Sequence, residues 1–165
     1  SGGINIFPKW ANKEQTEIYY TKFLKEPTLF RYNIYTGKKK RVLSSPGMLI
    51  VSDVKKDKLL LTLAINDQPD IYEFDINSRK LKRITNFSGI DVNGHFYDNK
   101  IVFISDRLGY PNVYQKDLET GMVSKLIHHG KNHISVSTNG DNVVVSSRET
   151  DKAFERNTFN LLLIN

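Results

Sequence analysis

The chain has 165 residues, no cysteine, a formal net charge of +6 and a hydrophobic fraction of 39%. These values are typical of a globular domain, and they exclude disulfides, thiolate metal sites and a cysteine nucleophile. No apolar run is long enough to cross a bilayer, so we expect no membrane insertion, and the positive charge favours acidic partners. The first residues, Ser1 to Gly3, lack an initiator methionine and indicate a piece of a longer protein.

An internal repeat with a period of 42 residues organises the chain. Four apolar runs, EIYYT, KLLLTLA, KIVFISD and NVVVSS, are centred on Tyr19, Leu61, Phe103 and Val145. A second series of alternating segments keeps this spacing through Phe30, Tyr72 and Tyr114. With a polar strand after each of these segments, a unit holds about four strands, which is typical of the repeats of about 40 to 50 residues that form propeller blades.

The four units predict one all-β domain over residues 1–165, a partial β-propeller with about four blades of four-stranded antiparallel sheets. The expected blades cover about 4–45, about 46–87, about 88–130 and, incompletely, about 131–165. The second strand of each unit is apolar on both faces, so it requires cover on both sides, which neighbouring blades supply. The fourth unit stops inside its third strand, and we expect the chain alone to self-associate through its open propeller ends.

A tight turn is predicted between the third and fourth strands of the first three units. The turns share an Asx residue, a hydroxyl three residues later and then a turn residue: Asn33, Thr36 and Gly37; Asp75, Ser78 and Arg79; Asp117, Thr120 and Gly121. Glycine adopts positive φ without steric cost, so Arg79 weakens the prediction for the second turn.

Residues 101–121, IVFISDRLGYPNVYQKDLETG, resemble the propeller repeat of the TolB family, with its apolar strand, Ser-Asp-Arg, Gly, a short loop, an aromatic residue, Asp and a Gly turn. The start NIFPKWANKEQTEIYYT is similar to the first segment of that family's blades, with Ala11 and Asn12 in place of Ser-Pro. RETDKAFERNTFNLLLIN resembles the long-loop blade of TolB proteins from ε-proteobacteria. The resemblance covers essentially the whole chain.

The resemblance implies a six-bladed propeller behind a smaller N-terminal α/β domain, located in the periplasm within the Tol-Pal cell-envelope system. It implies a non-enzymatic scaffold that has no cofactor, binds no nucleic acid, and has the peptidoglycan-associated lipoprotein Pal and other Tol proteins as partners. The same repeat occurs in peptidases of the prolyl-oligopeptidase class, as a regulatory propeller beside a hydrolase domain. The chain contains no Gly-x-Ser-x-Gly motif, so in that alternative the catalytic part lies outside it.

The loops after the second strands carry the candidate partner-binding residues, because loops on rigid repeat scaffolds carry recognition. These candidates are Asn66, Asp67, Asp106, Arg107, Tyr110, Arg148 and Glu149. Charged groups beside a tyrosine suit a protein interface. The alternative is that Asp106 and Arg107 brace their own loop through hydrogen bonds or an ion pair.

Other polar clusters favour structural interpretations. His128, His129 and His133 are close in sequence, but no cysteine or acidic cluster accompanies them, so we expect solvated loop residues and no metal. The basic run from Lys38 to Arg41 is expected on a solvated outer strand rather than in an anion site.

Two further interpretations concern packing. Trp10, the only tryptophan, is expected to pack between blades rather than to anchor an interface. Scattered carboxylates are expected at turns and on the surface: Glu14, Glu17, Asp53, Asp57, Asp91 and Asp98.

Overall fold

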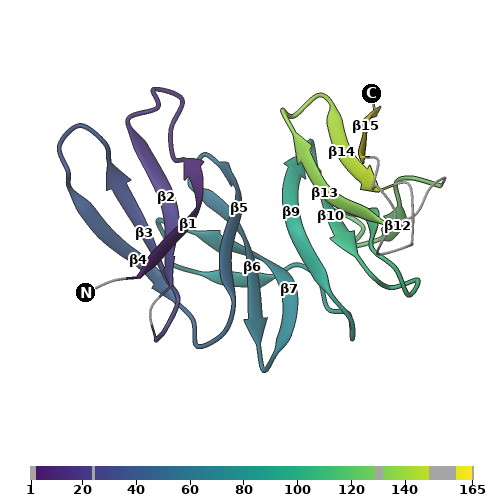
Figure 1. The fold of residues 1–165 in the computed structure, drawn as a ribbon, viewed down its shortest axis with the longest axis horizontal. Helices are drawn as coiled ribbons and strands as arrows, with labels where there is room; N and C mark the ends of the chain where they lie inside the picture. The colour runs from purple at the N-terminus through teal and green to yellow at the C-terminus, as the bar shows by residue number, and fades with distance from the viewer. Residues whose placement is uncertain (1–2, 24, 129–131, 149–158, 165) are drawn as a thin grey trace. The chain divides into compact units, whose positions relative to one another are not determined.

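The computed structural model describes residues 3–23, 25–128, 132–148 and 159–164, and its regular elements in that part of the chain are all β-strands. Consecutive strands pair into four antiparallel sheets. The sheets form two compact units, Ser1–Asn86 and Phe87–Asn165 (Figure 1). Within the described ranges, no helix is long and apolar enough to span a membrane.

The first unit contains blades one and two. Blade one has the strand order β1 (Ile4–Trp10), β2 (Glu17–Phe23), β3 (Thr28–Asn33) and β4 (Lys39–Ser44). Blade two follows with β5 (Leu49–Lys55), β6 (Lys58–Ile65), β7 (Gln68–Asp75) and β8 (Leu81–Arg83). Within each of these blades, strands that are neighbours in the sequence therefore pair with each other.

The second unit contains blades three and four. Blade three is formed by β9 (Asp91–Tyr97), β10 (Lys100–Ser105), β11 (Asn112–Asp117) and β12 (Val123–Lys125). In the described residues, blade four has three strands, β13 (His133–Thr138), β14 (Val143–Arg148) and β15 (Phe159–Ile164). These topologies confirm the predicted all-β fold built from propeller blades.

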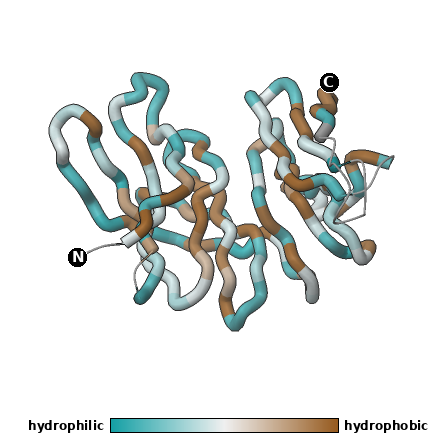
Figure 2. Tube along the Cα trace, viewed as in Figure 1, coloured by the Kyte–Doolittle hydropathy of each residue, from teal (hydrophilic) through white to brown (hydrophobic). Residues whose placement is uncertain are grey.

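The burial of the second strands explains why their sequences are apolar throughout. The repeat residues Tyr19, Leu61, Phe103 and Val145 lie in four different sheets and are at most 1% exposed. Six consecutive residues of β6 and the last five of β10 are buried, so both faces of these strands are covered. The outer strand β8 is exposed throughout, and Figure 2 shows hydrophobic residues concentrated along the inner strands.

The three turns between third and fourth strands share one hydrogen bond, in which the side-chain oxygen of Asn33, Asp75 or Asp117 accepts the amide three residues later. In blade three, the Asp117 carboxylate accepts hydrogen bonds from the amide and hydroxyl of Thr120, at 2.8 and 3.0 Å. The Gly121 amide donates to the Asp117 carbonyl at 3.0 Å, and Gly121 has a φ of +73°. This local chemistry explains why the turn recurs with the repeat.

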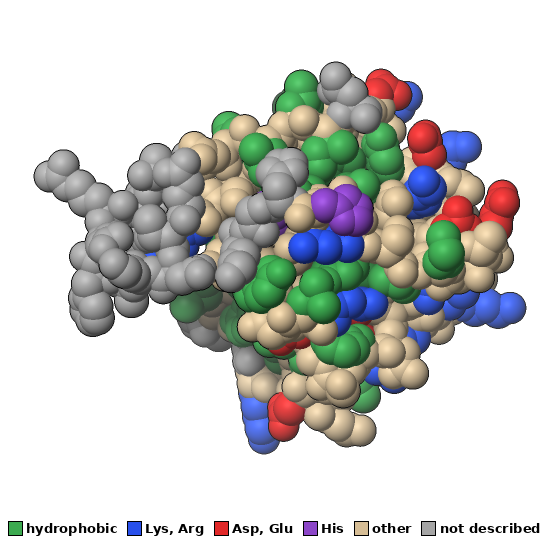
Figure 3. All heavy atoms as spheres, turned by 90° about the vertical axis from the view of Figure 1, so that its right-hand side faces the viewer, with side chains coloured by type: hydrophobic (Ala, Val, Ile, Leu, Met, Phe, Trp, Pro, Cys, Tyr) green, Lys and Arg blue, Asp and Glu red, His purple; other side chains and the backbone are tan. Residues whose placement is uncertain are grey.

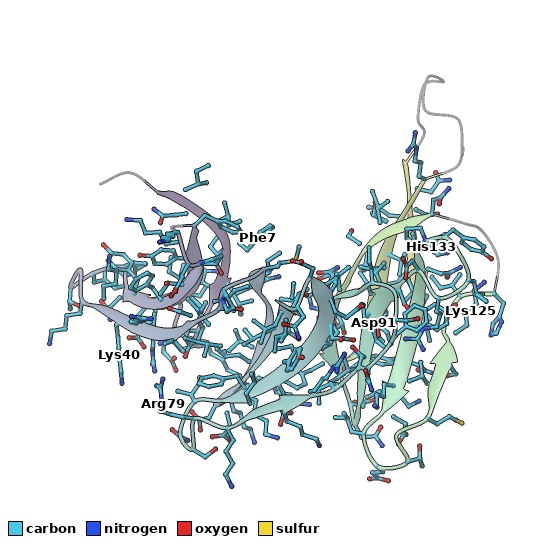
Figure 4. The ribbon with its side chains drawn as sticks, turned by 90° about the horizontal axis from the view of Figure 1, so that it is seen from below. Phe7, Lys40, Arg79, Asp91, Lys125 and His133 are labelled. Carbon is cyan, nitrogen blue, oxygen red and sulfur yellow. The ribbon has the colours of Figure 1, made fainter. Side chains whose placement is uncertain are left out.

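The turn in blade two forms with Arg79 in the left-handed conformation that glycine occupies elsewhere, at a φ of +56° (Figure 4). The guanidinium compensates for the unfavourable backbone through two contacts. Its Nη2 donates to the carbonyl of Val42 at 2.9 Å, and its centre lies 5.9 Å from that of the Phe74 ring. Arg79 therefore joins the turn of blade two to the outer strand of blade one.

Substitution at Arg79 is expected to separate the backbone cost from the side-chain gain. We expect Arg79→Ala to be less stable than Arg79→Gly by about 1 kcal/mol, because both remove the guanidinium but only glycine relieves the positive φ. Chemical denaturation measures the difference, and Gly37→Ala is the control at an open position of the same conformation. Equal stabilities of the two Arg79 variants would contradict the expectation.

The hydrogen bonds of the Asp117 turn predict a pH dependence. The amide of Thr120, and less strongly its hydroxyl, lower the pKa of the Asp117 carboxyl below its ordinary value. A carboxyl with a lowered pKa stabilises the fold above its unfolded-state pKa, and this contribution disappears as the pH falls through the folded-state pKa. We expect carboxyl NMR titration to show that Thr120→Val raises the pKa of Asp117. An unchanged pKa would remove the hydroxyl as a contributor.

Candidate protein-binding site

The loop between β10 and β11, residues 106–111, is hydrogen-bonded to the segment that precedes β9. One carboxylate oxygen of Asp106 accepts the amide of Ile90 at 2.7 Å, and the Asp106 amide donates to the Ile90 carbonyl at 3.2 Å. A Cβ on Gly89 would lie 2.3 Å from the Asp106 Oδ1 atom, so any larger residue at this position would force that carboxylate to shift. The two segments therefore form one fixed edge of blade three.

Arg107 forms an ion pair with Asp91 on β9, the residue labelled in Figure 4. Its Nη2 lies 3.1 Å from both carboxylate oxygens of Asp91, and its Nε donates to the Ser105 hydroxyl at 2.9 Å. The side chain of Asp91 is 0% exposed and that of Arg107 is 22% exposed. These contacts are the ones expected if Arg107 braces its own loop. The interpretation of Asp91 as a surface residue is wrong, because its side chain is fully buried and the Arg107 guanidinium compensates its charge.

Three aromatic rings surround the guanidinium of Arg107. Its centre lies 5.0 Å from the ring of Phe87, 5.5 Å from that of Phe103 and 4.8 Å from that of Tyr114. Burial raises the pKa of the Tyr114 hydroxyl, while the positive charge of Arg107 opposes that shift. The neutral phenol and the cation are therefore compatible neighbours in the interior of blade three.

A pocket of about 370 Å³ lies beside this loop, within the second unit. Its lining is mainly apolar and comes from the residue before β9, from β9 and β10, from the 106–111 loop and from the start of β13: Ile90, Val92, Ile104, Asp106, Gly109, Tyr110, Pro111, His133 and Ile134. Ile90 and Ile134 are exposed, Tyr110 is half-buried, and His133 is buried. The ammonium of Lys125 lies 5.8 Å from the centre of the Tyr110 ring.

Two of the predicted site residues, Asp106 and Tyr110, line this pocket. Arg148 belongs to the same unit, at the end of β14, and its amide donates to the carbonyl of Asn132 at 3.1 Å, but it is not among the lining residues. Asn66 and Asp67 form an exposed two-residue turn of the first unit, with φ values of +53° and +60°. Glu149 lies outside the described residues.

The isoleucines and His133 of the pocket carry no sequence signal of their own. Ile90 directly precedes the first strand β9 and Ile134 lies within the first strand β13, so neither belongs to the predicted recognition loops, and the fold brings both to the pocket that Tyr110 lines. Of the three histidines, His128 is exposed, His133 is buried and His129 falls outside the described residues. No group of three potential metal ligands occurs within the described ranges.

Packing between blades is the expectation for Trp10, which ends β1 with 48% of its surface exposed. The ring lines a groove of the first unit together with Val54 and Lys55 of blade two, so it lies beside the neighbouring blade without being buried against it. The sequence places a tryptophan at a strand end, but whether the ring points inward depends on the following turn.

The family model described as the TolB beta propeller domain matches residues 1–161. The chain belongs to the TolB β-propeller family. Curated relatives named Tol-Pal system protein TolB are 50% identical in Wolinella succinogenes and 45% identical in Helicobacter hepaticus, in each case over 99% of this chain. The chain spans 40% of the length of each of these relatives.

Solved structures agree with the family assignment. TolB from Acinetobacter baumannii is 25% identical with a TM-score of 0.82, over 98% of this chain and 41% of that one. A puromycin-hydrolyzing peptidase from Mycobacterium tuberculosis has a TM-score of 0.75 but 9% identity, over 100% of this chain and 27% of that one. At that identity the likeness concerns the fold alone, so it gives no support to the peptidase alternative.

Proposed function

We propose that the chain is part of a non-enzymatic, periplasmic scaffold of the Tol-Pal system that binds the lipoprotein Pal through its blade loops. The observation that carries the proposal is that different side chains of the 106–111 loop have different roles. Asp106 and Arg107 hold the loop from within, while Tyr110 lines an apolar pocket beside exposed isoleucines. The names of the curated relatives support membership of the Tol-Pal system.

The physical properties of this pocket suit a protein partner. An apolar centre bordered by polar and charged groups is the usual composition of a protein interface, and tyrosine is enriched there. A loop fixed by the hydrogen bonds of Asp106 and the ion pair of Arg107 loses little conformational entropy when a partner binds. The pocket therefore offers Tyr110 as an anchor on a preorganised surface.

Self-association of the isolated chain is a second part of the proposal. Leu161 and Leu163 on β15 are exposed, and Figure 3 shows hydrophobic side chains grouped on a face of the molecule. Sedimentation of the 165-residue chain over a concentration range tests this part, and a mass that stays monomeric throughout would contradict it.

Calorimetric titration of the soluble domain of Pal into the full-length protein and into this chain tests Pal binding. We expect both to bind, with affinities within about tenfold of each other, because the proposed pocket lies inside the chain. Binding to the full-length protein alone would place the site elsewhere. Binding to neither would contradict the proposal as a whole.

A further inference from the structure

The first unit contains a second groove, of about 620 Å³, at the ends of strands opposite to those that carry the Asn66–Asp67 turn. It lies between the turn that follows β1 and the tight turn between β5 and β6. Strands β1 and β5 pack side by side (Figure 1). Trp10, Ala11 and Val54 are its apolar lining residues. None of these residues belongs to the Tyr110 pocket.

The rim of this groove is cationic. Lys13, Lys55 and Lys56 line it and are exposed, while Asp57 is the one carboxylate among the lining residues. Arg31 also lines the groove, but the Glu17 carboxylate pairs with its guanidinium. The lining therefore keeps a net positive charge even when Arg31 and Lys55, each of which has a partner, are both counted as neutral. The fields of neighbouring lysines add, which favours an anionic ligand over a neutral one.

The wall of the groove in blade one is fixed before any ligand binds. The side-chain oxygen of Asn12 accepts the amides of Thr16 and Glu17 at 3.1 and 3.3 Å, and its amide nitrogen donates to the Thr16 hydroxyl at 2.7 Å. The Ala11 amide donates to the Glu17 carbonyl at 2.8 Å. The turn that presents Trp10 and Lys13 is thus held by its own hydrogen bonds, and binding requires little ordering of it.

An exposed tryptophan between lysines points to a ligand with both apolar and acidic groups. A large ring at the centre of a concave surface is a typical anchor for a partner side chain. Trp10 is the one aromatic residue among the described lining residues, so the groove offers no ladder of rings on which successive nucleic-acid bases stack. The lysines match carboxylates on either side of the anchored side chain.

We propose that the groove binds an acidic peptide segment of a partner protein, with one apolar side chain on Trp10 and flanking carboxylates on Lys13, Lys55 and Lys56. This proposal does not rest on Pal binding, since every residue in it belongs to Ser1–Asn86. It also gives a location to the acidic-partner preference that the net charge of +6 indicates.

The single tryptophan allows a direct measurement, because all indole fluorescence of the 165-residue chain comes from this groove. A synthetic peptide that alternates leucine with aspartate and glutamate serves as the probe, and its Asn/Gln counterpart is the control. We expect the acidic peptide to shift the Trp10 emission saturably, with an affinity that falls at least about tenfold between about 50 and 500 mM salt. The amide counterpart should bind more weakly by a similar factor.

Charge reversal localises the site. We expect the double variant Lys55→Glu/Lys56→Glu, and separately Lys13→Glu, to weaken binding, the double variant at least about tenfold. The matched control is Lys40→Glu/Lys82→Glu, which reverses two exposed lysines outside the groove and should change the affinity by less than about twofold. Circular dichroism establishes that each variant is folded.

Four results would overturn the proposal. They are no saturable emission change, equal binding of the acidic and amide peptides, equal losses in the groove and control variants, and tighter binding of heparin, single-stranded DNA or anionic vesicles than of the peptide. The last result would assign the groove to a different anionic polymer or surface. Failure of Pal to bind the same chain affects none of these readouts.

Discussion

Replacement of Arg107 by methionine is expected to lower the free energy of unfolding by about 3 kcal/mol, near the lower end of the values for breaking a buried ion pair. The methionine keeps apolar contact with the surrounding rings but leaves the Asp91 carboxylate buried without its cation. The residual exposure of Arg107, 22%, is the reason for choosing the lower end. Urea denaturation followed by circular dichroism measures the loss, and hydrogen exchange of β9 to β11 localises it.

Two controls define the meaning of this loss. The double variant Asp91→Asn/Arg107→Met should recover part of it, because no uncompensated charge remains. Arg83→Met removes the cation from another buried carboxylate, Asp70, which keeps a hydrogen bond from the Thr85 hydroxyl, so a smaller loss is expected. If Arg107→Met lowers the free energy of unfolding by less than about 0.5 kcal/mol, Arg107 does not brace the loop, and the partner-binding interpretation of this residue is favoured instead.

Replacement of Leu61 by alanine is expected to cost about 2 to 5 kcal/mol, because it removes a fully buried side chain from a close-packed core. Leu61 is 0% exposed and packs within a cluster that joins blades one and two. A cavity there weakens the packing of both blades. Trp10 fluorescence during denaturation reports on this unit directly, since the ring lies at the edge of the same pair of blades.

Leu81→Ala is the matched control in the same sheet. Leu81 lies on the outer strand β8 and is 41% exposed, so its truncation should cost well under half as much as that of Leu61. Equal losses at the two leucines would contradict the inner and outer roles of β6 and β8.

Features that depend on local chemistry could be predicted from the sequence. The 42-residue repeat places a strand that is apolar on both faces in each unit, and Tyr19 and Leu61 accordingly lie buried in different sheets. The turn at Asp117 was predictable because the Asp117 side chain closes it by accepting a hydrogen bond from within the turn, and a glycine follows four residues after Asp117. These features need only neighbours in sequence.

Features that depend on pairing between distant strands could not be predicted. The ion pair of Arg107 with Asp91 requires the register between β9 and β10, which no local pattern specifies. Register also differs between blades: Tyr20 pairs with Phe30 in blade one, whereas Leu61 pairs with Tyr72 in blade two. The pairing of the second strand with the third strand is therefore shifted by one residue between blades one and two, although the spacing of the repeat is constant.

The most direct test of binding through the 106–111 loop is the affinity of the Tyr110→Ala variant of the full-length protein for the soluble domain of Pal. We expect this variant to bind at least about tenfold more weakly than the parent, because a tyrosine anchor typically contributes more than 1.4 kcal/mol. Its unfolding free energy should stay within about 1 kcal/mol, since Asp106 and Arg107 hold the loop. Tyr35→Ala, at a 77% exposed tyrosine in a turn of the other unit, should leave the affinity unchanged. Unchanged affinity of Tyr110→Ala, or an equal loss in both tyrosine variants, would contradict the assignment of the pocket as the Pal site.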